Sequence, residues 1–225
     1  MILYRQVKDG IFLSRPNRFI AHVLVEGKEE VCHVKNTGRC RELLVPGAKV
    51  TLSVSDNPMR KTRYDLVAVW KGNTYINMDS QAPNHAAGEA LWHLLPGVKQ
   101  VKGEVTHGES RLDFFAETEE GTWFVEVKGV TLEKDGHALF PDAPTERGIK
   151  HLNTLETCVA EGHKAAALFV IQMKGVHSFS PHDQMHPAFG DALRHAAANG
   201  VEVWAYDCIV TENGMTIDQA IPVKL

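Results

Sequence analysis

The chain has 225 residues, of which 44% are hydrophobic and 23% are charged, and its formal net charge is −4. This composition is typical of a globular protein with one large or two small domains, and it excludes a disordered or fibrous chain. No run approaches the roughly 18 apolar residues of a membrane span, and the start lacks signal-peptide features, so we expect a cytoplasmic protein without membrane contact.

Charge is distributed unevenly along the chain. Residues 1–80 contain 13 Lys and Arg against 8 Asp and Glu, whereas residues 81–225 contain 11 against 20. Such asymmetry suggests a polyanion-binding arm on an acidic body, although solvated faces that merely differ between two domains explain the charge counts equally well.

The first 82 residues have the pattern of a small β domain. Residues 10–27 read as a strand interrupted at Arg15-Pro16-Asn17, residues 29–36 and 48–58 as two more strands, and residues 63–79 as a hairpin about Gly72-Asn73. A short helical piece is expected at GRCRELL, residues 38–44. Roughly five short strands predict a small barrel of the OB type.

Residues 83–225 have the pattern of a mixed α/β domain. We expect helices near residues 86–95, 145–160 and 187–199, the last ending at Gly200. Strands are expected at residues 99–105, 110–117, 122–130, 166–173 and 201–207, and a closing hairpin at Asn213-Gly214. This order predicts a mixed central sheet with helices packed on it.

Charged residues interrupt two of these strands, in the stretch RLDFFAETEEGTWFVEVKG. Because side chains alternate along a strand, Glu126 and Lys128 share a face, and a two- or four-residue loop between the strands places Asp113 on that face too. A three-residue loop with a bulge would upset the alignment. Two carboxylates at one point repel each other unless a hard cation such as Mg²⁺ binds both.

This pattern predicts phosphodiester hydrolysis. Asp113, Glu126 and the backbone carbonyl of Val127 are the candidate metal ligands, and Lys128 is expected to orient the attacking water or stabilise charge on the phosphate. Mn²⁺ could replace Mg²⁺. Glu89 and Glu104 are candidates for a further acid. The alternative reading is an exposed cross-strand pair of little energetic value, because such a string also occurs by chance.

Two groups of basic residues are candidates for phosphate binding. In the expected helix 145–160, Arg147, Lys150, His151 and Thr154 recur at helical spacing and form one polar face, which could also be merely solvated. In the barrel, loops and strand ends carry amides and cations suited to a sugar-phosphate backbone, namely Arg15, Arg18, Lys35, Asn36, Arg39 and Arg41. Pairing with nearby Glu residues is the alternative for these arginines.

Cysteine and histidine give weaker signals. Cys32, Cys40, Cys158 and Cys208 are widely spaced, which favours reduced, packed thiols. His177, His182 and His186 lie close together but lack the spacing of a zinc motif, and His137 and His151 flank the expected acidic site.

Several segments together resemble the sugar fermentation stimulation protein A family. They are RPNRF, NTGRCRELLVPG, RLDFFAE, FVEVKGVTL, FPDAPTERGIKHL and the later FSP, and they span nearly the whole chain. The resemblance implies an OB-type domain, residues 1–82, joined to a restriction-endonuclease-like domain of the PD-(D/E)xK superfamily, residues 83–225. It also implies the catalytic set Asp113, Glu126 and Lys128, although Leu112 replaces the motif proline.

The resemblance implies DNA binding and a regulatory role in sugar metabolism. We therefore predict a Mg²⁺-dependent DNA nuclease that contacts the backbone of double-stranded DNA without sequence specificity. The alternative is a non-catalytic DNA-binding regulator linked to sugar (maltose-type) metabolism that retains the acidic site, because this fold hosts binding proteins as well as nucleases. RNA binding through the barrel is a third reading, and pairing of two protomers into a homodimer stays open.

Overall fold

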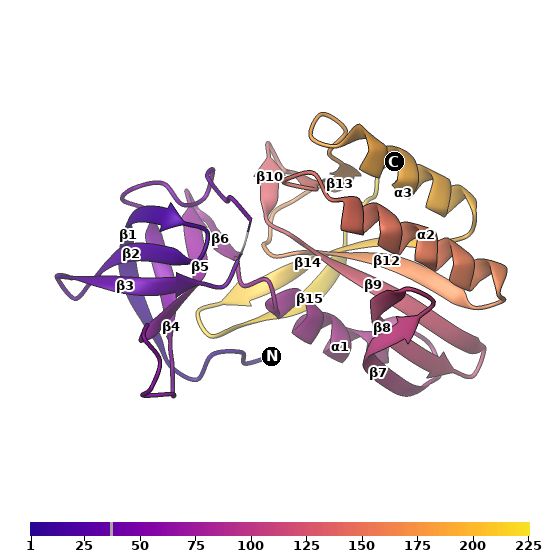
Figure 1. Cartoon of the computed structure of the whole chain (residues 1–225), viewed down its shortest axis with the longest axis horizontal. Helices are drawn as coiled ribbons and strands as arrows, with labels where there is room; N and C mark the ends of the chain where they lie inside the picture. The colour runs from indigo at the N-terminus through magenta and orange to yellow at the C-terminus, as the bar shows by residue number, and fades with distance from the viewer. Residues whose placement is uncertain (37) are drawn as a thin grey trace.

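The computed structural model describes residues 1–36 and 38–225. Its N-terminal part is a β-barrel, and its C-terminal part is a sheet covered by helices on both faces (Figure 1). The predicted class, a mixed α/β protein with an OB-like barrel at its N-terminus, is confirmed.

The barrel closes through five strands. Their order is β3-β2-β1-β4-β5, and a parallel pairing of β3 with β5 joins the two edges, while β6 extends the sheet as the second strand of a hairpin. Asn17 ends the first strand: its Oδ1 accepts the backbone N–H groups of Phe19 and Ile20, which turns the chain into the second. The strands are β1 (Val7–Asn17), β2 (Ile20–Val25), β3 (Lys28–Val34), β4 (Lys49–Val54), β5 (Tyr64–Lys71) and β6 (Thr74–Asn77).

The helical piece predicted at residues 38–44 is wrong. The segment forms a tight turn in which the Cys40 carbonyl accepts the N–H groups of Leu43 and Leu44. Leu43 and Leu44 are buried in the barrel, so these leucines anchor a turn and do not form a helix face.

The C-terminal sheet has six strands in the order β15-β14-β12-β9-β8-β7. Strand β12 is parallel to both β9 and β14, and the other neighbours are antiparallel, so the predicted mixed sheet is confirmed. The strands are β7 (Val98–His107), β8 (Ser110–Thr118), β9 (Gly121–Val130), β12 (Lys164–Ile171), β14 (Glu202–Thr211) and β15 (Gly214–Ala220).

Helices cover both faces of β12, as its continuous apolar sequence predicts. Ala166, Leu168 and Val170 pack in the cluster that contains the buried residues of helix α1 (Ala82–Leu94). The alternate residues pack with helices α2 (Glu146–Ala160) and α3 (Pro187–Ala198) on the opposite face. Each side chain therefore follows the period of two along the strand.

A small second sheet was not expected from the sequence. It has the order β10-β11-β13, with β11 and β13 parallel, and consists of β10 (Leu132–Lys134), β11 (His137–Phe140) and β13 (Ser178–Pro181). Its strands have only three or four residues, too few for an alternating apolar pattern to be recognised.

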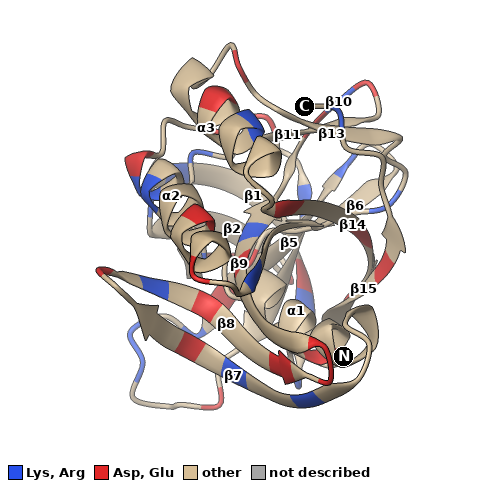
Figure 2. Ribbon diagram, turned by 90° about the vertical axis from the view of Figure 1, so that its right-hand side faces the viewer, with Lys and Arg blue, Asp and Glu red and all other residues tan. Residues whose placement is uncertain are grey.

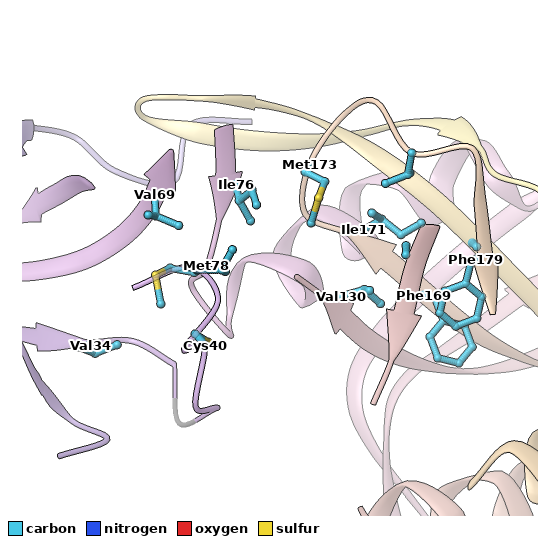
Figure 3. Packing of buried hydrophobic residues seen from close by; sticks show 14 of the residues in the cluster. Val34, Cys40, Val69, Ile76, Met78, Val130, Phe169, Ile171, Met173 and Phe179 are labelled. Carbon is cyan, nitrogen blue, oxygen red and sulfur yellow. The ribbon is translucent and has the colours of Figure 1, made fainter. Parts of the chain in front are cut away.

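The barrel and the C-terminal sheet share one apolar cluster. Ile76 and Met78 on the barrel side face Ile171 and Met173 on the side of the C-terminal sheet (Figure 3). We call this contact region the joint. Beside them, buried Gln172 donates from its Nε2 to the carbonyls of Asn77 and Asp79, at 3.0 and 3.1 Å. These contacts fix the two parts relative to each other. The predicted domain boundary after residue 82 stays a prediction.

All four cysteines are free and buried, as the sequence indicated. Among the residues that the structure describes, no helix has the length and apolar character needed to cross a membrane.

The joint gives a first prediction. Replacing Gln172 by Leu should lower the free energy of unfolding by about 2 kcal/mol, because the Asn77 carbonyl loses the Gln172 donor and the Asp79 carbonyl keeps only the Ala82 N–H. Urea unfolding measures this change. The exposed Gln219→Leu serves as control and should change the stability by less than about 0.5 kcal/mol. Equal stability of the two variants would contradict a structural role of the joint.

Candidate active site

The hairpin that contains the predicted acidic residues has a two-residue loop, Glu119-Glu120, between β8 and β9. Phe114 is paired with Val125, so Asp113 comes next to Glu126 in the same register. The loop thus meets the condition under which Asp113, Glu126 and Lys128 share a face.

Strand β8 leaves β9 immediately beyond this pair. The ladder between them ends at Phe114 and Val125, and from there β7 and β8 curl beneath α2 (Figure 2). The Asp113 carboxylate takes over the vacated hydrogen bond: its Oδ2 accepts the Val127 N–H at 2.8 Å. Its Oδ1 accepts from Asn84 Nδ2 of α1, also at 2.8 Å.

The same separation exposes a backbone carbonyl to the gap. In an extended strand the N–H and C=O of one residue point to the same edge. Since the Val127 N–H points to Asp113, the Val127 C=O also points into the gap between β8 and β9. This position suits the predicted role of the Val127 carbonyl as a third protein ligand of a metal ion.

Glu126 is almost fully buried, with 3% of its surface exposed. Its Oε1 accepts from Lys128 Nζ at 2.5 Å and from the Nδ1 of His151 in α2. Its Oε2 is buried and has no hydrogen-bond partner. A buried carboxylate oxygen without a donor is costly, and a cation is one of the few groups that satisfy it.

Arg147 holds His151 in place. Its Nε donates to His151 Nε2 at 3.3 Å, and a guanidinium has only donors, so His151 Nε2 acts as acceptor. The ring proton therefore lies on Nδ1, where it is donated to Glu126. A chain of hydrogen bonds thus runs from Arg147 through His151 to the carboxylate.

The two carboxyl groups differ in their acidity. Burial and then the negative charge of Glu126 raise the pKa of Asp113, despite the hydrogen bonds from Val127 and Asn84. Burial also acts to raise the pKa of Glu126, but the hydrogen bond from His151 and the charge of Lys128 outweigh it and lower that pKa. The site therefore holds one firmly ionised carboxylate beside another that ionises at a cost.

Helix α2 turns its predicted polar face partly toward the sheet. His151 is buried on Glu126, and Thr154 Oγ1 lies 2.8 Å from Ser110 Oγ of β8. Lys150 is exposed and donates to the Glu109 carbonyl at 3.2 Å. The face is therefore not a uniformly solvated one. His151 contacts the Glu126 carboxylate, and its binding of phosphate stays a prediction.

The basic residues of the barrel fall into two groups. Arg15 donates to the carbonyls of Arg18, Asn36, Gly38 and Arg39, at 2.6 to 2.9 Å, so its guanidinium is used in holding the loops together. Lys35 pairs with buried Asp79 at 2.8 Å, and Asn36 accepts the Gly38 N–H and donates to the Met78 carbonyl. Binding of phosphate by these residues stays a prediction, and Arg15 and Lys35 would first have to leave these partners.

The three other candidate arginines of the barrel are exposed. Arg18, Arg39 and Arg41 line a hollow of about 730 Å³ at one end of the barrel, which the segment Ala143-Pro144 completes on the side of α2. The structure brings these three together, but neither Glu126 nor Lys128 lines this hollow.

In residues 1–36 and 38–225, no three His, Cys, Asp or Glu side chains gather closely enough to form a metal cluster. The candidate set contains two carboxylates and a carbonyl, which is sufficient for Mg²⁺ because this ion keeps several waters. Asn84, the partner of Asp113, escaped sequence reasoning, since an amide in a helix carries no motif.

Known proteins resemble this chain over its whole length. The family model described as the sugar fermentation stimulation protein RE domain matches residues 81–214, and the model of the SfsA N-terminal OB domain matches residues 13–78. A sugar fermentation stimulation protein homolog of Desulfitobacterium hafniense (strain Y51) is 54% identical over 99% of this chain and 98% of its own length. A homolog of Ruminiclostridium cellulolyticum is 50% identical over 99% of both chains.

A solved structure also matches. The structure of Pyrococcus furiosus SfsA in complex with Ca²⁺ superposes with a TM-score of 0.89 at 28% sequence identity and covers 100% of both chains.

The acidity difference gives a second prediction. Asp113→Asn should raise the free energy of unfolding at about pH 7 in the presence of a chelator, because an amide avoids the burial and repulsion that disfavour the charge. A carboxyl whose pKa is raised by folding binds its proton more tightly in the folded state, so the wild type should regain the difference as the pH falls toward about 4. Urea unfolding at both pH values measures this change.

Glu126→Gln is the matched control with the opposite sign. In the wild type, folding lowers the pKa of Glu126. Ionised Glu126 therefore stabilises the folded protein at pH values above its unfolded-state pKa, and this stabilisation is lost as the pH falls through its folded-state pKa. The variant should lose about 1–3 kcal/mol at about pH 7, since its buried Nε2 lacks an acceptor. A change in the free energy of unfolding in the same direction for both variants would refute the assigned directions of the two pKa shifts.

Proposed function

We propose that this chain, which belongs to the sugar fermentation stimulation protein family, binds DNA and hydrolyses the phosphodiester bonds of the DNA with the help of Mg²⁺ or Mn²⁺. The observation that most supports this proposal is Glu126 Oε2, a buried carboxylate oxygen without a hydrogen-bond donor, beside Asp113 and Lys128. Such an arrangement is expected where a cation completes the site.

The donor set fits a hard divalent ion. Asp113, Glu126 and the Val127 carbonyl offer oxygen only, and each Asp113 oxygen, with one donor each, keeps a free lone pair. The related Pyrococcus furiosus protein was solved with Ca²⁺, another oxygen-seeking ion. When bound, Mg²⁺ would supply positive charge for the phosphate oxygens and increase the acidity of water.

The protein's own side chains would do the remaining work. Lys128, with 18% of its side chain exposed, can reach a phosphate at the mouth of the site, where its charge offsets negative charge that develops during attack. His151 and Arg147 fix the Glu126 carboxylate from the helix side, which leaves Oε2 free to bind an ion. Arg18, Arg39 and Arg41 would hold the DNA backbone at the barrel end.

Metal binding can be tested without activity. Titration with Mg²⁺ or Mn²⁺ should raise the unfolding temperature of the wild type, since a ligand at about 100 times its dissociation constant adds about 2.7 kcal/mol. Glu126→Gln should lose this increase. The exposed Asp191→Asn on α3 is the control and should keep it. An increase that survives in Glu126→Gln would place the ion elsewhere.

Cleavage is tested with supercoiled, linear, single-stranded and branched DNA. Lys128→Met should retain the metal-induced stabilisation and lose about 100-fold or more in cleavage rate, as expected when one group that stabilises transition-state charge is removed. Full activity in this variant would indicate a contaminant. DNA binding without cleavage of any substrate by the wild type would favour the non-catalytic regulator.

A further inference from the structure

Three adjoining hollows form a groove from the barrel to Asp113. The first is the arginine-lined hollow at the barrel end, and the second, of about 460 Å³, lies between Gly129–Leu132 and Leu139–Thr145. Arg18, Gly38, Ala143 and Pro144 line both. The third, of about 600 Å³, lies between α1 and the strands β7 and β8, contains Asp113, and shares Ser80 with the second.

An exposed aromatic ring, Phe19, directly follows Arg18, which lines the barrel end of this groove. Phe19 is 51% exposed at the tip of the β1–β2 turn, although a free phenyl ring in water is unfavourable. Asn17 fixes this turn through two backbone hydrogen bonds, and Arg15 ties it to the neighbouring loop. The fold therefore holds the turn in a defined shape that presents Phe19 beside exposed Arg18.

The far end of the groove displays a second aromatic ring. Trp92 of α1 is 49% exposed and lines the third hollow together with Phe114. Gly88 and Gly103 form part of the same wall, where their lack of side chains leaves room. Among the described residues, the other strongly exposed aromatic ring is that of Trp70, which is 43% exposed, stacks on Tyr75 and lines a separate hollow.

The dimensions of the groove favour a single strand. Hollows of about 300–1,000 Å³ accommodate a drug-sized molecule, which corresponds to one or a few nucleotides and not to a duplex. Duplex bases are stacked inside the helix and cannot reach Phe19 or Trp92, whereas unpaired bases stack on exposed rings. Arginines beside such rings follow the strand's phosphates.

We propose that this groove binds an unpaired DNA strand, with bases stacked on Phe19 and Trp92, and leads it past Ser80 to Asp113. The substrate class is thus single-stranded DNA or a single-stranded flap, in place of the double-stranded DNA expected from the sequence. This inference rests on the proposed nuclease function for the role of its acidic end, but its binding part is independent of cleavage.

Charge makes the two ends behave differently. Glu89, Glu104 and Asp113 surround the third hollow and repel phosphate, so a strand enters it only when a divalent ion offsets their charge. The barrel end needs no ion, because Arg18, Arg39 and Arg41 supply the positive charge. Contact with Phe19 is therefore independent of divalent ions, and contact with Trp92 requires them.

The test compares a labelled strand of roughly 16 nucleotides with its duplex by fluorescence anisotropy, in chelator and in Ca²⁺. The strand should bind at least tenfold more tightly than the duplex. Phe19→Ala should weaken strand binding about tenfold under both conditions, equivalent to about 1.4 kcal/mol. Met59→Ala, which removes another exposed apolar side chain, is the control and should bind as the wild type does.

Tryptophan fluorescence reports on the far end. Strand binding should quench the wild type in Ca²⁺ and not in chelator, Trp92→Phe should abolish the quenching, and Trp70→Phe should retain it. Equal affinity for duplex and strand, together with no effect of Phe19→Ala or Trp92→Phe, would overturn the groove assignment.

The two proposals fail separately. Strand binding that depends on Phe19 without cleavage of any DNA would reject the nuclease and keep the groove. Metal-dependent cleavage of duplex DNA at a rate unchanged by Phe19→Ala would keep the nuclease and reject the groove.

Discussion

The candidate site depends on the separation of β8 from β9 at Asp113. A β-ladder that continued would have satisfied the Val127 N–H with a neighbouring carbonyl and left no gap for a ligand. Because Asp113 takes this hydrogen bond with its side chain, β8 can diverge without leaving a buried donor unpaired. The divergence also allows β8 to reach α2, where Ser110 meets Thr154. One carboxylate therefore ends a strand pairing, lines the gap and faces Glu126.

The joint between barrel and sheet positions the groove around this gap. Gln172 donates to the carbonyl of Asn77, the last residue of the barrel strand β6. It also lies against Gly129, the residue after Lys128. A Cβ at Gly129 would come within 2.6 Å of Gln172 Oε1 and 2.7 Å of Pro83 Cγ, so only glycine permits this approach. The barrel arginines and the acidic residues are thereby held by one rigid arrangement.

Much of this organisation could be predicted from local patterns. Alternation along a hairpin places Asp113, Glu126 and Lys128 together because their relation depends on two neighbouring strands and a short loop. Partners distant in sequence could not be predicted: nothing near Lys35 indicates that it pairs with Asp79. Helical spacing placed His151 on a polar face, but only the packing of α2 shows that this face contacts Glu126.

The apolar cluster that spans the joint has a consequence for how the two parts can exist. Ile76 and Met78 complete their burial in the same cluster as Ile171 and Met173, so a chain cut between the barrel and the sheet would expose apolar surface on both fragments. The two parts should therefore fold as one cooperative unit. They would be inherited together, since neither is a module that can be exchanged without its neighbour.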